Sequence, residues 1–252
     1  MITLQELAEY TDTLLASAQF QDYCPNGLQV EGRAEVRTLV SGVTACLELI
    51  EAAVALQADA IVVHHGYFWK GEDACITGMK QRRLRRLLGA DISLLAYHLP
   101  LDAHARLGNN TQLGRVLGIE PEGNFGSETD QQLGQYGHLS PALDGEALAA
   151  HLEQRLGRAP QHIPGAAERI ATVGWCTGAA QSYIDAAAAR GLDAFISGEI
   201  SEQTVHVARE TGIHYFAAGH HATERYGVQA VGEALAGEFS LQHCFFDCDN
   251  PV

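Results

Sequence analysis

Three segments of the chain place imidazole and carboxylate side chains directly after apolar runs that predict strands. They are His64-His65, His98-Leu-Pro-Leu-Asp102 and His220-His-Ala-Thr-Glu224. The last two both carry a histidine four residues before a carboxylate. Zinc, iron and manganese are bound in proteins by these ligand types. Because the carboxyl ends of parallel strands face one crevice, the sequence predicts a metal site built from these segments.

The first ligand candidates leave alternatives open. In a regular strand the consecutive side chains of His64 and His65 point to opposite faces. Both can bind metal only if the strand ends there, which Gly66 permits, or if each serves a different ion; otherwise one is a hydrogen-bonded core residue. Asp102 could bridge two cations through its two oxygens, or it could be the N-cap of a following helix. His98 is either a ligand or a residue that orients one.

In the last segment we expect a helix to begin near Ala222. His220 would then come from the strand end and Glu224 from the first helical turn, so both could reach one ion. We expect His221 to face solvent and Thr223 to be a local cap.

The number of candidate ligands exceeds what one ion requires. A single tetrahedral ion needs three or four, whereas five are expected here: His64, His65, Asp102, His220 and Glu224. Five ligands with two carboxylates that can bridge fit two ions a few ångströms apart, as in two-metal hydrolytic sites. The ligand types leave the choice among zinc, iron and manganese open.

The order of the elements predicts an α/β fold. Short apolar strands alternate with helices, which indicates βαβ units and largely parallel sheets. Residues 42–66 align with 174–199, allowing a short gap, and this pairs Asp59-Ala-Ile-Val-Val with Asp193-Ala-Phe-Ile-Ser. An internal duplication would explain the match, although βαβ units also resemble one another generally.

We therefore predict two similar α/β halves that are intertwined. Residues 1–125 would carry His64, His65 and Asp102, and residues 126–252 would carry His220 and Glu224. We expect the segment 121–168 to connect the halves and to hold one or two strands and a helix around Glu146–Leu156.

Composition narrows the class of protein. The 252 residues are 46% hydrophobic and 19% charged, as in ordinary globular proteins. The first fifteen residues have no basic region, so we expect no signal peptide, and no apolar run is long enough to span a membrane. The six cysteines lack CxxC spacing, which indicates reduced thiols of a cytoplasmic protein. Cys244 and Cys248 lie four positions apart, but we expect no metal role for them.

Several short motifs together resemble the dinuclear metal-centre hexameric proteins, the NGG-interacting-factor-three-like family, whose members are named type 2 homologues of GTP cyclohydrolase I. The resemblance covers nearly the whole chain. Its motifs are Asn26-Gly-Leu-Gln-Val30, His64-His-Gly-Tyr-Phe68, His98-x-x-x-Asp102 with Gly108-Asn-Asn110, Ser197-Gly-Glu199, Gly219-His-x-x-x-Glu224 and Asp249-Asn-Pro251. This chain departs from the family at Gly66, where many members have proline.

The resemblance implies that His64, His65, Asp102, His220 and Glu224 bind a metal pair. It also implies an α/β protomer that assembles into a homohexameric toroid. The family name suggests a metal-dependent hydrolase that opens the purine ring of GTP and releases formate, and phosphoesters or cyclic amides are the other substrates to consider.

Two residues are candidates for proton transfer in such a hydrolase. They are Glu199, which aligns with the paired histidines of the first half, and His98.

The alternative function is a non-catalytic, metal-stabilised ring that acts as a binding scaffold. The net charge of −15 argues against nucleic acid, unless a basic helix gathers at the ring opening. The basic residues of that helix are Lys80, Arg82, Arg83, Arg85 and Arg86.

Overall fold

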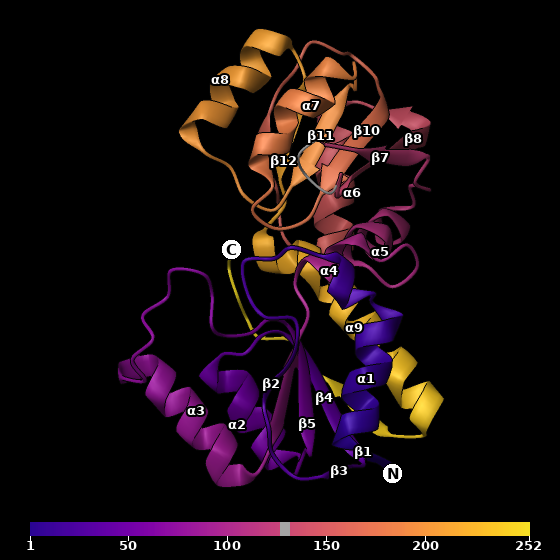
Figure 1. Ribbon diagram of the computed structural model, residues 1–252. Helices are drawn as coiled ribbons and strands as arrows, with labels where there is room; N and C mark the ends of the chain where they lie inside the picture. The colour runs from indigo at the N-terminus through magenta and orange to yellow at the C-terminus, as the bar shows by residue number, and fades with distance from the viewer. Residues whose placement is uncertain (127–131) are drawn as a thin grey trace. The chain divides into compact units, whose positions relative to one another are not determined.

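The computed structural model describes residues 1–126 and 132–252, which form two compact units (Figure 1). The first unit comprises Met1–Gly108 and Gly227–Asp249, and the second comprises Asn109–Tyr226 and Asn250–Val252. The chain thus enters the second unit after Gly108, earlier than residue 125, and returns to the first unit after Tyr226. Each unit is assembled from separate stretches of sequence.

The first unit has a five-stranded sheet in the order β13-β4-β5-β6-β2 and a short β1-β3 pair. Strands β13, β4, β5 and β6 are parallel, and β2 is antiparallel to β6. The elements are β1 (Ile2–Thr3), α1 (Leu4–Leu14), the 3-10 helix η1 (Ser17–Gln19), β2 (Gly27–Val30), β3 (Glu35–Val36), β4 (Thr38–Thr44), α2 (Leu47–Ala55), β5 (Ala60–His65), α3 (Gly78–Ala90), β6 (Ser93–Ala96), α4 (Leu99–Ala103), the later part of α9 (His220–Phe239) and β13 (Gln242–Phe245).

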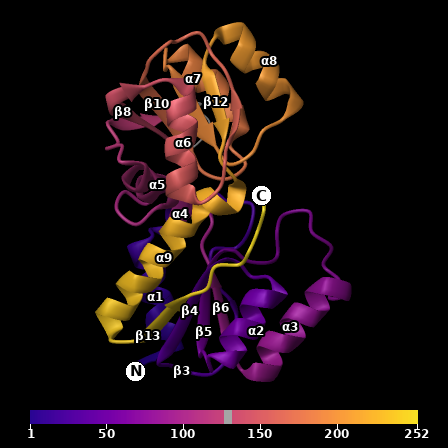
Figure 2. The same cartoon turned by 180° about the vertical axis from the view of Figure 1, so that it is seen from behind.

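Helices cover both faces of this sheet, as the two opposite views show (Figures 1 and 2). On one face, Leu7 of α1 and Val231 of α9 pack with Val62 of β5. On the other, helices α2 and α3 pack against the neighbouring strand residues, Ile61 and Val63. The alternation along β5 explains why this strand is an unbroken apolar run in sequence, since both of its faces are buried.

The second unit has a six-stranded sheet in the order β7-β8-β10-β11-β12-β9. Strands β10, β11 and β12 are parallel, and the flanking strands are antiparallel. The elements are α5 (Asn109–Leu117), β7 (Gly123–Phe125), β8 (Gly134–Leu143), α6 (Gly145–Leu156), β9 (Gln161–Ile163), β10 (Ile170–Cys176), the 3-10 helix η2 (Gln181–Tyr183), α7 (Ile184–Ala189), β11 (Ala194–Ser197), α8 (Glu202–Thr211), β12 (His214–Ala217) and the start of α9. Helices α5 and α6 contribute to one core cluster, and α7 and α8 contribute to the other.

The segment 121–168 holds strands and a helix, as expected, and α6 matches the helix predicted around Glu146–Leu156, but its described part does not form a connection between the halves. Strands β7, β8 and β9 and helix α6 belong to the second unit's own sheet and core. Residues 127–131 of the expected connection lie outside the described residues.

The two halves share the arrangement strand-helix-strand-helix-strand, in β4-α2-β5-α3-β6 and in β10-α7-β11-α8-β12. They also share the hydrogen bonds of one aspartate. Asp59 Oδ2 accepts from the backbone N–H of Thr38 at 2.9 Å and of the preceding residue at 2.8 Å. Asp193 Oδ2 accepts from Thr172 at 2.8 Å and from its preceding residue at 2.9 Å. The predicted α/β class with two similar halves is confirmed.

Among the described residues, no helix combines the length and the apolar character needed to cross a bilayer.

Candidate metal centre

The first ligand group lies at the carboxyl edge of the first unit's sheet, where β5 ends at His65. The ring centroids of His64 and His65 are 4.4 Å apart, although the two residues are consecutive. His64 is fully buried and His65 is partly exposed. The strand end that Gly66 permits is therefore present, and the two imidazoles lie side by side.

Hydrogen bonds hold each of these imidazoles by its Nδ1 atom. His64 Nδ1 is 3.0 Å from the carbonyl oxygen of Tyr97, which can only accept, so the proton of the neutral ring lies on Nδ1. His65 Nδ1 is 3.1 Å from Thr44 Oγ1, at the end of the neighbouring strand β4. A backbone or hydroxyl partner at Nδ1 fixes the orientation of a histidine that coordinates metal through Nε2.

Asp102 is buried, and its Oδ1 atom lies 3.5 Å from His64 Nε2. It is the fourth residue of α4, which begins at Leu99, so the alternative of an N-cap role is wrong. A Nε2 lone pair and a carboxylate oxygen that lie this close both favour a cation near them.

His98 lies beside the same pair, with its ring centroid 5.1 Å from that of His64 and 5.8 Å from that of His65. The three histidines can each offer a nitrogen within 4.8 Å of the others' nitrogens. His98 Nδ1 is 2.7 Å from Asp22 Oδ1, so a carboxylate holds this ring as the carbonyl of Tyr97 holds His64.

Asp22 is a residue that the sequence did not single out. Its carboxylate also accepts from Asn26 Nδ2 and from the backbone N–H of Leu99, both at 2.9 Å. Burial would raise the pKa of Asp22, but the hydrogen bonds and charge of His98 and the bonds from Asn26 and Leu99 outweigh it and lower the pKa to about 2. The carboxylate is ionised at neutral pH and fixes His98.

The motif Asn26-Gly-Leu-Gln-Val30 acquires a structural reason here. Asn26 Oδ1 accepts from the backbone N–H of His98 at 2.8 Å. Gln29 bridges the backbone of Tyr67, accepting from its N–H at 2.7 Å and donating to its carbonyl at 3.1 Å. An added Cβ at Gly66 would overlap this Gln29 side chain. The motif therefore positions the segments that follow β5 and β6.

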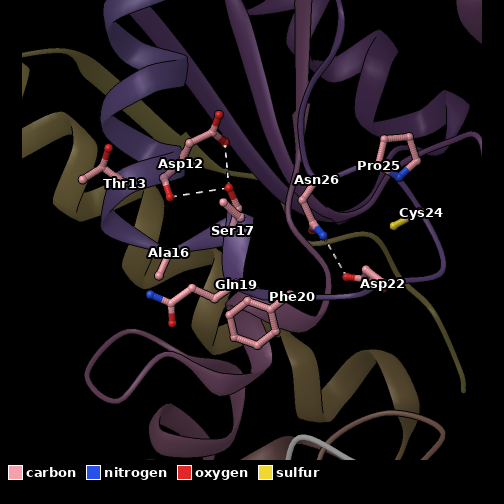
Figure 3. Close-up of a pocket in the computed structure, with 11 residues that line it drawn as sticks. Asp12, Thr13, Ala16, Ser17, Gln19, Phe20, Asp22, Cys24, Pro25 and Asn26 are labelled. Carbon is pink, nitrogen blue, oxygen red and sulfur yellow. Dashed lines mark hydrogen bonds between the residues drawn. The ribbon is translucent and has the colours of Figure 1, made fainter.

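A pocket of about 600 Å³ adjoins this cluster, because Asp22 and Asn26 form part of its wall (Figure 3). Figure 3 also shows Asp12 and Ser17 hydrogen-bonded to each other on its other side. The lining combines carboxylate, amide and hydroxyl groups with one aromatic ring, Phe20. Such a pocket could accept a polar small molecule that donates hydrogen bonds.

The second ligand group lies at the start of α9 in the second unit. The helix begins at His220 and not near Ala222, so His220 and Glu224 are neighbours one helical turn apart. His220 Nε2 is 3.1 Å from Glu224 Oε2. His221 is 7% exposed, so the expectation that it faces solvent is wrong. Thr223 lies inside the helix, where its hydroxyl donates to the carbonyl of His220 at 2.9 Å, and it is not a helix cap.

Glu199 follows β11 and contacts the other side of the same imidazole, with Oε1 2.7 Å from His220 Nδ1. Burial would lower the pKa of His220, but hydrogen bonds to Glu224 and Glu199 and their charges outweigh it and raise the pKa to about 9. The imidazole of His220 thus lies between two carboxylates. In protein metal sites, a carboxylate at one nitrogen of a histidine commonly orients the ring so that the other nitrogen binds the ion.

Gly178 is a further residue of this site that the sequence does not single out. It follows β10 with φ +67°, a conformation that favours glycine, and an added Cβ would overlap the Glu224 carboxylate and approach His220 Nε2 at 3.2 Å. Its N–H donates to Thr223 Oγ1 at 3.1 Å. The only sequence signal is a glycine after a strand, Cys176-Thr-Gly178, which is too common to single out.

Comparison with known proteins identifies the family. The family model Duf34/NIF3 (NGG1p interacting factor 3) matches residues 2–251. A relative from Pseudomonas aeruginosa, named "GTP cyclohydrolase 1 type 2 homolog", is 55% identical over 251 residues, which cover 100% of this chain and 99% of the relative. A solved structure described as "protein ybgI, unknown function" covers 100% of both chains with a TM-score of 0.94 and 50% identity. A crystal structure from Thermus thermophilus covers 100% of both chains with a TM-score of 0.85 and 32% identity.

The chain belongs to the Duf34/NIF3 family. The resemblance drawn from the sequence motifs is thereby confirmed.

Proposed function

We propose that the protein binds two divalent metal ions per chain through His64, His65, Asp102, His220 and Glu224. The observation that carries this proposal is the way the histidines are held. The Nδ1 atoms of His64, His65 and His220 face a carbonyl, a hydroxyl and a carboxylate oxygen, respectively. A partner at Nδ1 orients each ring so that Nε2 is the coordinating atom, as in protein metal sites.

The donor set fits the proposed ions. Neutral imidazole nitrogens and carboxylate oxygens suit zinc, iron and manganese alike. In both groups a carboxylate oxygen lies near a histidine Nε2, at 3.5 Å for Asp102 and His64 and at 3.1 Å for Glu224 and His220. Each carboxylate has two oxygens, so either one could serve two ions.

We further propose that the reaction is a hydrolysis. Two divalent ions held by these residues would supply a water of lowered pKa and would polarise the bond under attack. The chain's own contribution would be orientation and proton transfer. His98, held by the ionised Asp22, is the candidate to move a proton. Glu199 orients His220 and is better described as a positioning residue than as the acid or base expected from the alignment.

The pocket walled by Asp22 and Asn26 is the proposed place for the substrate, because it adjoins His98. The name that the relatives carry suggests GTP, whose hydrolysis would break a C–N bond and release formate. A phosphoester or a cyclic amide fits the same metal chemistry.

The metal proposal is tested by anaerobic purification followed by elemental analysis. We expect close to two divalent ions per chain, and a clear loss of metal in His64→Ala and in Glu224→Gln. Two controls change the same residue types at exposed helical positions: His206→Gln in α8 and Glu233→Gln in α9. Metal content that is unchanged in both ligand variants would contradict the proposal.

The hydrolase proposal needs a separate assay. The metal-loaded protein is incubated with GTP and with panels of phosphoesters and cyclic amides, and formate, phosphate and amine are measured. We expect turnover of one of these classes that disappears in Glu224→Gln and persists in Glu233→Gln. Full metal occupancy without turnover of any class would contradict hydrolysis and favour the scaffold.

We also propose that the chain assembles as a homohexamer, which the family resemblance supports. Light scattering of the purified protein should give about six times the chain mass of 27.1 kDa. A monomeric mass at micromolar concentration would contradict this.

A further inference from the structure

Two cysteines that are distant in sequence lie together in the first unit. Cys46 is the residue before α2, and Cys248 follows β13 by three residues. Their Sγ atoms are 3.4 Å apart. Strand β13 is parallel to β4 (Figure 2), with Phe245 paired to Ser41. The segments that follow these two strands therefore leave the sheet at the same edge, which brings the two cysteine side chains together. Both residues are partly exposed.

The surroundings make the two thiols unequal. Cys46 Sγ accepts from the backbone N–H of Leu49 at 3.5 Å, in the first turn of α2. The hydrogen bond from Cys248 lowers the pKa of Cys46 despite its burial, and the helix amides and the charge of Arg83 act in the same direction. The same hydrogen bond, burial and neighbouring negative charge raise the pKa of Cys248. One proton is thus held mainly on Cys248, and Cys46 is the better nucleophile.

We propose that Cys46 and Cys248 form a redox-active dithiol that converts reversibly to an intramolecular disulfide. The oxidant would be a low-molecular-weight disulfide such as oxidised glutathione. This modification site is separate from the proposed metal ligands and does not depend on the proposed hydrolysis.

The exchange proceeds in two balanced steps. The Cys46 thiolate attacks one sulfur of oxidised glutathione, an S–S bond forms as the original one breaks, and glutathione leaves as a thiolate. Cys248 then loses its proton to solvent and attacks Cys46 Sγ, which releases the second glutathione. The protein loses two electrons and two protons, and one glutathione disulfide becomes two glutathione thiols.

The geometry requires only a small movement. A disulfide has its sulfurs about 2.05 Å apart, and Cys248 lies beyond the end of β13, outside the paired residues of the sheet. Closure would fasten the segment after β13 to the N-cap residue of α2. Cys244, on β13 itself, is exposed, and its Sγ atom faces the carbonyl of Phe245 at 3.7 Å. It provides a matched control four residues away.

The test uses the full-length protein in buffers with increasing ratios of oxidised to reduced glutathione. Remaining thiols are alkylated under denaturing conditions, and the disulfide is located by peptide mass spectrometry. We expect Cys46 and Cys248 to be lost together as one linked peptide pair and to return on reduction. Cys244→Ser should leave this transition unchanged.

Single variants test the assigned roles. Cys248→Ser should trap a glutathione adduct on Cys46, because the resolving thiol is missing. In Cys46→Ser the remaining thiol of the pair is Cys248, and in Cys248→Ser it is Cys46. We expect the remaining Cys248 to react with glutathione disulfide at least tenfold more slowly than the remaining Cys46. The proposal is overturned if wild-type protein accumulates separate glutathione adducts without the linked pair. It is equally overturned if both thiols stay reduced at every ratio.

Discussion

Replacing Asp22 by asparagine should destabilise the first unit and loosen His98 without changing the size of the side chain. The wild-type carboxylate accepts four hydrogen bonds. Oδ1 accepts from Tyr23 N at 2.6 Å and lies 2.7 Å from His98 Nδ1, and Oδ2 accepts from Asn26 Nδ2 and Leu99 N at 2.9 Å. An asparagine amide has one oxygen, so whichever way it lies, two donors face an NH₂ group that cannot accept.

The expected loss of folding stability follows from these hydrogen bonds. Leaving a buried donor without its acceptor costs about 1–3 kcal/mol. Because Asp22 lines an open pocket, water can reach some of these groups, so we take the low end and expect about 2 kcal/mol for the two donors together. The lowered pKa of Asp22 gives a second measure of this loss of stability. A fall from 3.8 to about 2 corresponds to about 2 kcal/mol before solvent screening, and to about 1–2 kcal/mol after it.

The pKa shift also fixes the direction of the pH dependence. Since the pKa of Asp22 is lower in the folded protein than in the unfolded chain, its ionisation stabilises the fold above the unfolded pKa of about 4. This contribution is lost as the pH falls from about 4 towards 2. Asparagine does not titrate, so the stability difference between wild type and Asp22→Asn should shrink over the same interval.

The assay is urea denaturation at several pH values, with hydrogen exchange of peptides from the first unit to separate its unfolding from that of the second. Asp249→Asn, at an exposed position, is the control for the general effect of removing a carboxylate. A loss below about 0.5 kcal/mol at pH 7, smaller than any unsatisfied buried donor should give, would refute the reasoning. So would a difference that stays constant down to pH 2.5.

Three further changes test the second unit. Glu199→Gln should weaken metal binding about 10- to 100-fold, measured by competition with a metal indicator, because His220 loses its anionic partner; unchanged affinity would contradict the positioning role. Gly178→Ala should lower the metal content by displacing the Glu224 carboxylate, and elemental analysis at full occupancy would show that the clash is absorbed elsewhere. Asp193→Ala removes the acceptor of two backbone amides and should cost about 2–3 kcal/mol, seen as faster hydrogen exchange in the second unit only.

The strongest parts of the sequence prediction rest on residues whose chemistry and position in a strand agree. His64 and His65 end an apolar strand, and the alternation of strands and helices is enough to define the α/β class. Asp59 and Asp193, matched in sequence, make equivalent hydrogen bonds in the structure. Local pattern was sufficient at these positions because each residue lies in or next to a predicted strand, and the partners of Asp59 and Asp193 lie at the neighbouring strand of the same βαβ unit.

The weaker parts depend on contacts between distant segments. Nothing near Asp22 in sequence indicates that it holds His98, since the two residues are 76 positions apart. Cys46 and Cys248 likewise meet only because β13 pairs with β4. The predicted start of α9, near Ala222, is two residues too late. By sequence pattern His220 is a loop residue after a strand, but the helix begins there. Such features are set by the sheet order, which local sequence patterns do not encode.

The assembly of the first unit from two separated stretches has a consequence for the order of folding during synthesis. The ribosome makes Met1–Gly108 first, but this stretch lacks the edge strand β13 and the α9 residues Val228 and Val231 that fill one face of its core. The second unit is nearly complete by Tyr226. The half that is translated first must therefore finish folding last, and until then it exposes an apolar sheet face and an unpaired strand edge, the features by which nascent chains aggregate.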